Sequence, residues 1–164
     1  MGVGKGRTAR CLAEQTGMYA LDCDDLIESL ANKQIRKIFE EHGEQRFREL
    51  ERKTAEWLEK NVSGSAISTG GGFVGVPNLK KIGLVVYLHS DFDSIVRSLH
   101  EQPNAAKKIR KRPLLQDMAA ARKLYESRVP LYRKAADIEI FMAERSIERV
   151  VEEILTRTEL LVTA

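Results

Sequence analysis

The chain has 164 residues, of which 43% are hydrophobic and 31% are charged, and its formal net charge is +3. These values are ordinary for a globular protein, so we expect one domain over residues 1–164 with a real core. No apolar run is long enough to span a membrane, and no signal peptide opens the chain. The two cysteines, Cys11 and Cys23, have neither metal nor disulfide spacing, so we expect a cytoplasmic protein.

The first eight residues are similar to a phosphate-binding loop. Gly4 and Lys5 supply the centre of the motif G-x-x-x-x-G-K-[ST]. Two features depart from this motif: its first glycine would precede Met1, and Gly6 stands where a serine or threonine hydroxyl normally contacts Mg²⁺. A flexible basic N-terminus is the alternative interpretation, but the order of the elements that follow favours the loop.

A helix, a short strand and two acids come next. The helix is predicted to stop at Gly17, and the strand Tyr19–Leu21 ends at Asp22. Ligands of open α/β sheets bind at the carboxyl ends of strands, so Asp22 and Asp24 are placed to hold metal-bound water and to accept a proton from a substrate hydroxyl. Capping of the next helix by Asp24 is the structural alternative, and the two roles are compatible.

Residues 44–61 have helical periodicity. Their apolar stripe consists of Phe47, Leu50, Trp57 and Leu58. We therefore expect Trp57 in the core rather than at a ligand. Arg48 and Glu51 lie three residues apart on one helix face, where a guanidinium fixed by a carboxylate forms an anion clamp. A surface ion pair is the alternative interpretation.

Two further strands are predicted. Ser65–Ser68 runs into Gly70–Gly72, where backbone N–H groups can approach a ligand closely unless the glycines only form a tight turn. Leu84–Leu88 is continuously apolar, which is typical of a parallel sheet covered on both faces.

A basic cluster follows, formed by Lys107, Lys108, Arg110, Lys111 and Arg112. Few aromatic residues lie nearby to stack on bases, so this cluster suits phosphate better than nucleic acid. Residues 101–111 show little periodicity that would face a core. We predict a lid over about residues 99–115 that brings positive charge to a transferring phosphate, with a solvated basic loop as the alternative.

The last strand and helix complete the pattern. Ile138–Phe141 alternates as a strand, and Ser146 is expected to cap a helix. The inward-facing residues of that helix are predicted to be Ile147, Val150, Val151, Ile154 and Leu155. The alternation of strands and helices along the chain predicts a three-layer α/β/α domain with a central parallel sheet.

This sheet needs a central strand before the phosphate loop, and no residues precede Met1 to form it. A sheet without that strand would expose two ladders of unpaired backbone groups. We therefore expect that upstream residues are missing or truncated, or that another chain supplies the strand.

Taken together, the motifs resemble those of the shikimate kinase family. The resemblance runs from Gly2 to about Leu155. It rests on Gly4-Lys5, Asp22-x-Asp24, Phe47-Arg48-x-x-Glu51, Ser68-Thr69-Gly70-Gly71-Gly72, Arg112-Pro113-Leu114-Leu115 and Arg128-x-Pro130-Leu131-Tyr132. It implies a five-stranded parallel sheet of the nucleoside monophosphate kinase class, with a substrate-binding region at about residues 23–61. It also implies ATP, Mg²⁺ and shikimate as ligands and a monomer as the active form; nothing indicates nucleic acid or membrane binding.

The resemblance implies a role for each matching residue on the shikimate side. Asp24 matches the acid that binds the shikimate hydroxyls and serves as the base. Arg48 and Arg128 match the arginines that grip the shikimate carboxylate, and Glu51 matches the acid that orients Arg48. Gly71 and Gly72 match residues whose backbone contacts shikimate, and Ser68 is expected to support this side of the site.

On the nucleotide side, Lys5 matches the lysine that contacts the β- and γ-phosphates, and Arg112 matches the lid arginine that reaches them. Asp22 matches the acid that helps to hold the hydration shell of Mg²⁺. The full set of nucleotide-binding positions is Gly2, Val3, Gly4, Lys5, Gly6, Arg7 and Arg112.

Gly6 is the main departure from the family, because it removes the hydroxyl that binds the metal. A shifted register would use Arg7 as the cation and Thr8 as the hydroxyl, but it spoils the later match and shortens the distance to Asp22. We therefore keep Lys5 and expect weakened metal–nucleotide binding.

Three functions follow from these observations. The first is an active shikimate 3-kinase of aromatic amino-acid biosynthesis, because the shikimate-binding set is intact. The second is a catalytically silent relative that binds shikimate or nucleotide, because Gly6 and the missing glycine damage the loop. The third is another small-molecule kinase, such as a gluconate kinase, which does not predict Arg48 and Arg128 together.

Overall fold

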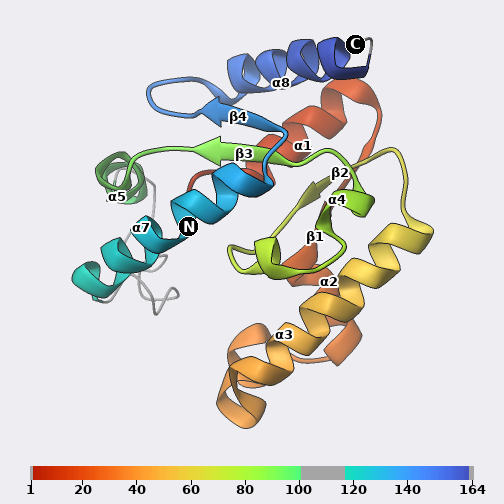
Figure 1. Ribbon diagram of the computed structural model, residues 1–164, viewed down its shortest axis with the longest axis vertical. Coiled ribbons are helices and arrows are strands. Elements are labelled where there is room, and N and C mark those ends of the chain that lie inside the picture. The colour runs from red at the N-terminus through yellow and green to blue at the C-terminus, as the bar shows by residue number, and fades with distance from the viewer. Residues whose placement is uncertain (1, 101–116, 163–164) are drawn as a thin grey trace. The chain divides into compact units, whose positions relative to one another are not determined.

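The computed structural model describes residues 2–100 and 117–162 (Figure 1). The chain divides into two compact units, one formed by Lys5–Val85 and the other by Met1–Gly4 with Val86–Ala164. Parallel strands alternate with helices in both units, as expected for an α/β protein of the P-loop kinase type. The first of the five expected strands is not among the described residues, and the lid falls largely on residues 101–116, which also lie outside them.

The unit of residues 5–85 contains two strands and most of the residues assigned to shikimate. Its elements are α1 (Lys5–Thr16), β1 (Tyr19–Asp22), α2 (Cys23–Ala31), α3 (Ile35–Asn61), β2 (Ser65–Ser68), the 3-10 helix η1 (Phe73–Gly75) and α4 (Leu79–Ile82). Strands β1 and β2 are parallel, and their register pairs Tyr19 with Ser65 and Asp22 with Ser68. Both predicted strands of this unit are confirmed, and their carboxyl ends lie side by side.

Local sequence explains where the first two helices begin and end. Helix α1 stops before Gly17, whose φ of 74° is open to glycine at little cost and whose N–H bonds to the carbonyl of Ala13 at 2.9 Å. Helix α2 is capped at its start by Asp22 and ends at Asn32, a left-handed residue with a φ of 48°. The predicted end of the first helix is confirmed.

Helix α3 is longer than predicted because it contains two helical segments joined at a kink. Gly43 has a φ of 73° and a ψ of −179°, values that interrupt the helix and that a residue with a Cβ adopts only with strain. The second segment corresponds to the predicted helix of residues 44–61, whereas the first, from Ile35, was not predicted. Figure 1 shows the resulting change of direction along α3.

Two groups of apolar side chains form the core of this unit. One contains Cys23, Ala55, Leu58, Phe73 and Val76, and the other contains Ile27, Ile38, Phe47 and Leu50. The prediction for Trp57 is wrong, because it is 47% exposed. Residue 57 lies about 100° around the helix from the buried Leu58, outside the stripe that faces the core.

The second unit contains β3 (Val86–His89), α5 (Phe92–His100), α7 (Met118–Ala135), β4 (Ile138–Phe141) and α8 (Ile147–Val162). Strands β3 and β4 are parallel, and Val86 pairs with Ile138. The predicted strand of residues 84–88 is therefore shifted: Leu84 has no partner in this ladder and is 45% exposed. The predicted strand Ile138–Phe141 is confirmed.

Helix α8 packs on β4. Ser146 caps it as predicted, with its hydroxyl accepting a hydrogen bond from the N–H of Arg149 at 3.4 Å. Val150, Val151 and Ile154 are buried. Within residues 2–100 and 117–162, no helix has the length and apolar character needed to cross a membrane.

Candidate active site

The carboxyl ends of β1 and β2 place an acid beside a hydroxyl. Asp22 and Ser68 are the last residues of these strands and are paired across the ladder. The Oδ1 of Asp22 accepts a hydrogen bond from the N–H of Asp24 at 2.9 Å, so Asp22 is the cap of α2. The expectation that Asp24 caps this helix is wrong, because the capping geometry falls one residue before Cys23, the first residue of α2.

The space at Gly6 opens onto this pair of residues. A Cβ added to Gly6 would lie 3.6 Å from the Oδ2 of Asp22 and 3.9 Å from the Oγ of Ser68. The Nη1 of Arg10 would also lie 3.6 Å from it. These are ordinary contact distances, so the backbone leaves room here for the side chain that the sequence lacks. Sequence analysis gave Arg10 no role at this point, because one position on a helix does not show which way its side chain points.

The residues of the phosphate-loop motif lie on both sides of the division between the units. Gly2 and Gly4 have φ values of 66° and 98°, which glycine accommodates without strain. Lys5 begins α1, while Arg7 is exposed and Thr8 is only 4% exposed. The burial of Thr8 argues against the register in which its hydroxyl replaces the missing one.

Asp24 lies in an electrostatic environment that suits a base. Asp24 is exposed as a residue, but partial desolvation of its carboxylate raises its pKa, the carboxylates of Asp22 and Glu51 raise it further, and the positive charge of Lys5 opposes them. A carboxylate whose pKa is raised holds a proton more readily than an ordinary aspartate does. Burial among the same acids also raises the pKa of the Cys23 thiol to about 12, so this cysteine stays protonated.

Arg48 is held between two carboxylates of its own helix. Its Nη1 donates to Glu51 at 2.5 Å, and its Nη2 and Nε donate to Glu44 at 2.7 and 3.1 Å. The side chain of Glu51 is 3% exposed, whereas that of Glu44 is 66% exposed. Burial lowers the pKa of Arg48, but the hydrogen bonds to Glu51 and Glu44 outweigh it and raise that pKa. The pair is therefore more than a surface ion pair.

Glu44 is a contact that sequence analysis missed. Its position four residues before Arg48 is the spacing at which a helix brings two side chains together, so this signal was available. Because Glu44 is exposed, its bonds to Arg48 are open to exchange with water or with a ligand.

The glycines after β2 make room for charged side chains. A Cβ on Gly72 would lie 1.9 Å from the Nη1 of Arg48, a distance that no side chain tolerates. A Cβ on Gly70 would lie 3.1 Å from the Oδ1 of Asp24 and 3.5 Å from the Oε1 of Glu51. Asp24, Arg48 and Glu51 therefore converge on the backbone of this turn.

Two predicted site residues cannot be placed within this cluster. Arg128 belongs to the other unit, where it is half-buried on α7 and hydrogen-bonds to Tyr132. The ring centroid of Tyr132 lies 5.3 Å from that of Tyr87. Arg112 lies outside the described residues.

The residues around Gly6 suit a hydrated magnesium ion. Asp22 and Ser68 offer oxygen atoms, the ligand type that this ion prefers, and Mg²⁺ commonly keeps several waters and few protein ligands. Among residues 2–100 and 117–162, no group of three or more His, Cys, Asp or Glu side chains has the arrangement of a metal site. A water-mediated contact needs no such group.

A glycine-rich loop that opens a helix, followed by a parallel strand that ends in an acid, is typical of the class of P-loop kinases of small molecules. The family model described as "Shikimate kinase" matches residues 1–159. The chain belongs to the shikimate kinase family, which uses ATP as the phosphate donor.

Curated relatives and solved structures agree with this assignment. The shikimate kinase of Sulfurihydrogenibium sp. is 38% identical over 162 residues, an alignment that spans 96% of this chain and 92% of the relative. That of Geobacter sulfurreducens is 39% identical over 163 residues, covering 95% and 85% respectively. The structure of shikimate kinase from Acinetobacter baumannii in complex with shikimate matches with a TM-score of 0.81 and 31% identity, covering 99% of this chain and 89% of that one.

Proposed function

We propose that the protein is a shikimate 3-kinase, which transfers the γ-phosphate of ATP to the 3-hydroxyl of shikimate and releases ADP and shikimate 3-phosphate. The observation that carries this proposal is the convergence of Asp24, Arg48 and Glu51 on the Gly70–Gly72 turn. Shikimate combines a carboxylate with hydroxyls, so a fixed guanidinium beside a carboxylate of raised pKa suits both of its ends.

In this proposal Asp24 orients the attacking hydroxyl and accepts its proton. The bond from the 3-oxygen of shikimate to the γ-phosphorus forms as the bond from that phosphorus to the β–γ bridging oxygen breaks, and ADP leaves with the bridging electrons. Arg48 and, in the other unit, Arg128 would bind the carboxylate of shikimate, while the backbone of Gly71 and Gly72 would contact the same ligand.

The nucleotide would be held by the loop and by two cations. The backbone N–H groups of residues 2–7 would surround the phosphates, as at other glycine-rich helix starts. Lys5 and Arg112 would stabilise the negative charge on the transferring group. The resemblance of residues 2–7 and Arg112 to the family's motifs supports this assignment.

We propose Mg²⁺ as the divalent metal, held through water by Asp22 and supported by Ser68. When bound with ATP, this ion would neutralise charge on the β- and γ-phosphates. Gly6 offers no hydroxyl, so we expect weaker binding of the metal–nucleotide complex than a serine or threonine at this position would give.

We also propose that the enzyme acts as a cytoplasmic monomer without a nucleic-acid or membrane partner. Two free cysteines, Cys11 and Cys23, support a reducing compartment. Light scattering and cell fractionation would test the two parts of this proposal separately.

Gly6 favours a second candidate, a shikimate-binding or nucleotide-binding relative without activity. The deciding measurement is release of ADP from Mg-ATP with shikimate, with gluconate and with neither, for the natural sequence and for Gly6→Ser. Shikimate-dependent release by the natural sequence supports the kinase. Release only by Gly6→Ser, or by neither protein although shikimate binds, supports the silent relative. Release with gluconate and not with shikimate would overturn the assignment.

A further inference from the structure

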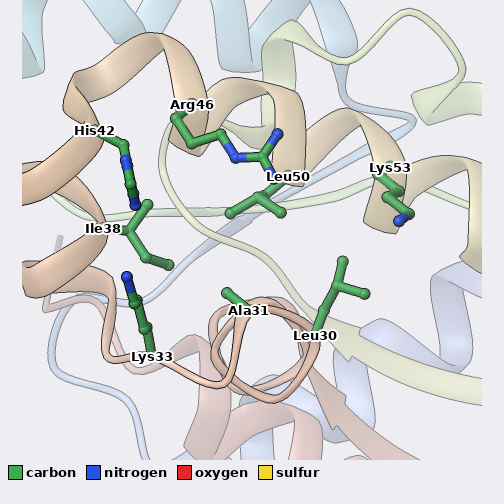
Figure 2. A pocket seen from close by; sticks show the side chains of 8 residues that line it. All are labelled: Leu30, Ala31, Lys33, Ile38, His42, Arg46, Leu50 and Lys53. Atoms are coloured by element: carbon green, nitrogen blue, oxygen red, sulfur yellow. The ribbon is translucent and has the colours of Figure 1, made fainter.

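A cavity of about 240 Å³ lies between the end of α2 and the two segments of α3 (Figure 2). We call it the α2–α3 pocket. Its lining consists of Leu30, Ala31, Lys33, Ile38, His42, Arg46, Leu50 and Lys53. Four of these side chains are apolar and four are basic, and none of the eight is acidic.

The apolar side chains form the inner surface of the pocket. Ile38 is 1% exposed and Leu50 is 5% exposed, and both belong to one packed core group. Leu30 is 47% exposed, so apolar surface continues from the core to the opening. In Figure 2 the side chain of Leu50 points into the space between the helices. This surface suits an apolar group of a ligand.

Basic groups stand around this apolar surface. In Figure 2, Lys33 and His42 point toward one another at one end of the pocket, and Lys53 lies at the other. Lys33 is paired with Glu41, and Arg46 with Glu49 at 3.0 Å, both acids lying outside the lining; the Nε2 of His42 also lies 3.6 Å from Glu41.

Lys53 differs from these residues. Within residues 2–100 and 117–162 it has no ion pair or side-chain hydrogen bond, and it is exposed at the opening of the pocket. One positive charge beside the pocket is therefore uncompensated, and Arg46 can turn to a stronger anion, because exposed ion pairs contribute little.

The pocket is separate from the cluster around Arg48. Arg46 and Leu50 are each two residues from Arg48, which places their side chains about 200° around α3 from it. The pocket also spans the kink, since Ile38 precedes Gly43 and Leu50 follows it. A ligand here would contact both segments of the helix without touching the residues assigned to shikimate.

We propose that the α2–α3 pocket binds a small organic anion that carries a phosphate or a carboxylate on one apolar ring. The volume of about 240 Å³ is below the range of about 300–1,000 Å³ typical of pockets for drug-sized molecules, so one ring fits better than two. The ring lies against Leu30 and Ala31 above the floor formed by Leu50 and Ile38, and the anion lies between Arg46 and Lys53, where a guanidinium and an ammonium offer charged hydrogen bonds. This proposal does not depend on the proposed function.

Amide-resolved NMR titration of the whole protein tests it. The probes are phenyl phosphate and benzoate, which distinguish the two anions, and the matched fragments are inorganic phosphate, acetate and benzyl alcohol. We expect saturable binding of at least one probe, about 10-fold tighter than its own anion fragment, because the buried ring adds apolar contact. The largest shifts should fall on the amides of Ala31, Leu50 and Lys53. Equal affinity for probe and fragment, or shifts confined to Lys5 and its neighbours, would overturn the proposal.

Substitutions then locate the site. Lys53→Gln should weaken the probe about 5-fold, and Arg46→Gln together with Lys53→Gln about 10-fold or more. Ala31→Leu should weaken it by filling the pocket. Lys37→Gln is the matched control, since it removes an exposed charge from the same helix outside the lining. Thermal unfolding selects the variants that keep the fold. An unchanged affinity in a folded Lys53→Gln, or an equal loss in Lys37→Gln, would contradict the proposal.

Discussion

Two regions of one unit differ in how completely their parts contact one another. Around Arg48 the contacts are closely fitted: the guanidinium binds Glu44 and the buried Glu51, and Gly72 leaves the room that the guanidinium occupies. Around Gly6, oxygen atoms of Asp22 and Ser68 border a space that no side chain fills. The region proposed for shikimate is therefore fixed by its own contacts, while the region proposed for the metal lacks a side chain at Gly6.

The largest effect should come from Arg48, the centre of the fixed region. Arg48→Ala removes the forked donor and leaves the buried carboxylate of Glu51 without its partner. The free energy of unfolding should therefore fall by about 3–5 kcal/mol. We expect kcat/KM for shikimate to fall about 1,000-fold, because a charged pair and its geometry are lost together.

Arg48→Lys separates the effect of the positive charge from the effect of the forked geometry of the guanidinium. It keeps a positive charge beside Glu51, so the free energy of unfolding should change little, while the loss of the fork should still reduce kcat/KM about 100-fold. Steady-state kinetics and urea unfolding measure the two quantities. Near-natural activity in Arg48→Lys would show that charge alone is sufficient and that this region is less closely fitted than we infer.

A smaller loss should follow from Gly72→Ala. The new Cβ would stand 1.9 Å from the Nη1 of Arg48, so the guanidinium must move. We expect KM for shikimate to rise about 30-fold with a small change in stability, because a misplaced donor binds poorly.

Gly75→Ala is the matched control for this prediction. Gly75 lies in the same turn region, and nothing lies within 4 Å of a Cβ added there. The KM values of the two alanine variants for shikimate should therefore differ by more than about 10-fold, because only Gly72→Ala introduces the steric clash. Equal values would mean that Arg48 is not held against Gly72 in solution.

In the other region, Gly6→Ser should improve binding rather than weaken it. The added Cβ would make ordinary contacts at 3.6–3.9 Å, so the side chain fits, and its hydroxyl would add an oxygen ligand beside Asp22 and Ser68. We expect the Kd of Mg-ATP to fall about 10-fold, which corresponds roughly to the contribution of one hydrogen bond to a charged group. Calorimetry with Mg-ADP reports this change without turnover.

Gly6→Ala controls for the backbone. It adds the Cβ without the hydroxyl, and it should leave nucleotide affinity close to that of the natural sequence. If alanine improved affinity as much as serine does, the gain would come from a stiffer helix start, and the idea of a missing metal ligand would be wrong.

Much of both regions could be predicted from sequence, for identifiable reasons. The strands Tyr19–Asp22 and Ser65–Ser68 are short, and one ends in an acid while the other is followed by glycines, so the residues at their carboxyl ends were predictable. The spacing of Arg48 and Glu51 predicted their contact. Spacing along a helix does not show how deeply a side chain is buried, however. The burial of Glu51 depends on the Gly70–Gly72 turn, which is distant in sequence.

Other features depended on tertiary contacts that the sequence did not reveal. The kink at Gly43 joins two segments that periodicity treats separately, and Trp57 lies beside the apolar stripe but not on it. The start of β3 is set by its pairing with Ile138, so the apolar Leu84 stays outside the strand. For β3 a partner far along the chain decided the outcome, whereas the kink lies in the backbone of Gly43 itself.

The smallest expected effect concerns stability and its dependence on pH. Burial and the charges of Asp22 and Glu51 raise the pKa of Asp24 in the fold. A carboxyl group with a raised folded pKa contributes stability below its unfolded pKa, and this contribution is lost as the pH rises through the folded value. At pH 7 the ionised Asp24 therefore destabilises the protein relative to a neutral side chain of the same shape.

Asp24→Asn should consequently unfold at a slightly higher urea concentration than the natural sequence at pH 7, although it removes the proposed base, and the gain should be small because Asp24 is exposed to solvent. The difference should shrink as the pH falls below the folded pKa, because both side chains are then neutral. Asp25→Asn is the matched control: Asp25 is exposed, as Asp24 is, and lies beside it in the first turn of α2. This variant should not gain stability, since it loses a favourable interaction with the helix dipole. A destabilised Asp24→Asn at pH 7 would mean that the attraction of Lys5 outweighs burial, and that the two regions are coupled through this aspartate more strongly than their separate contacts indicate.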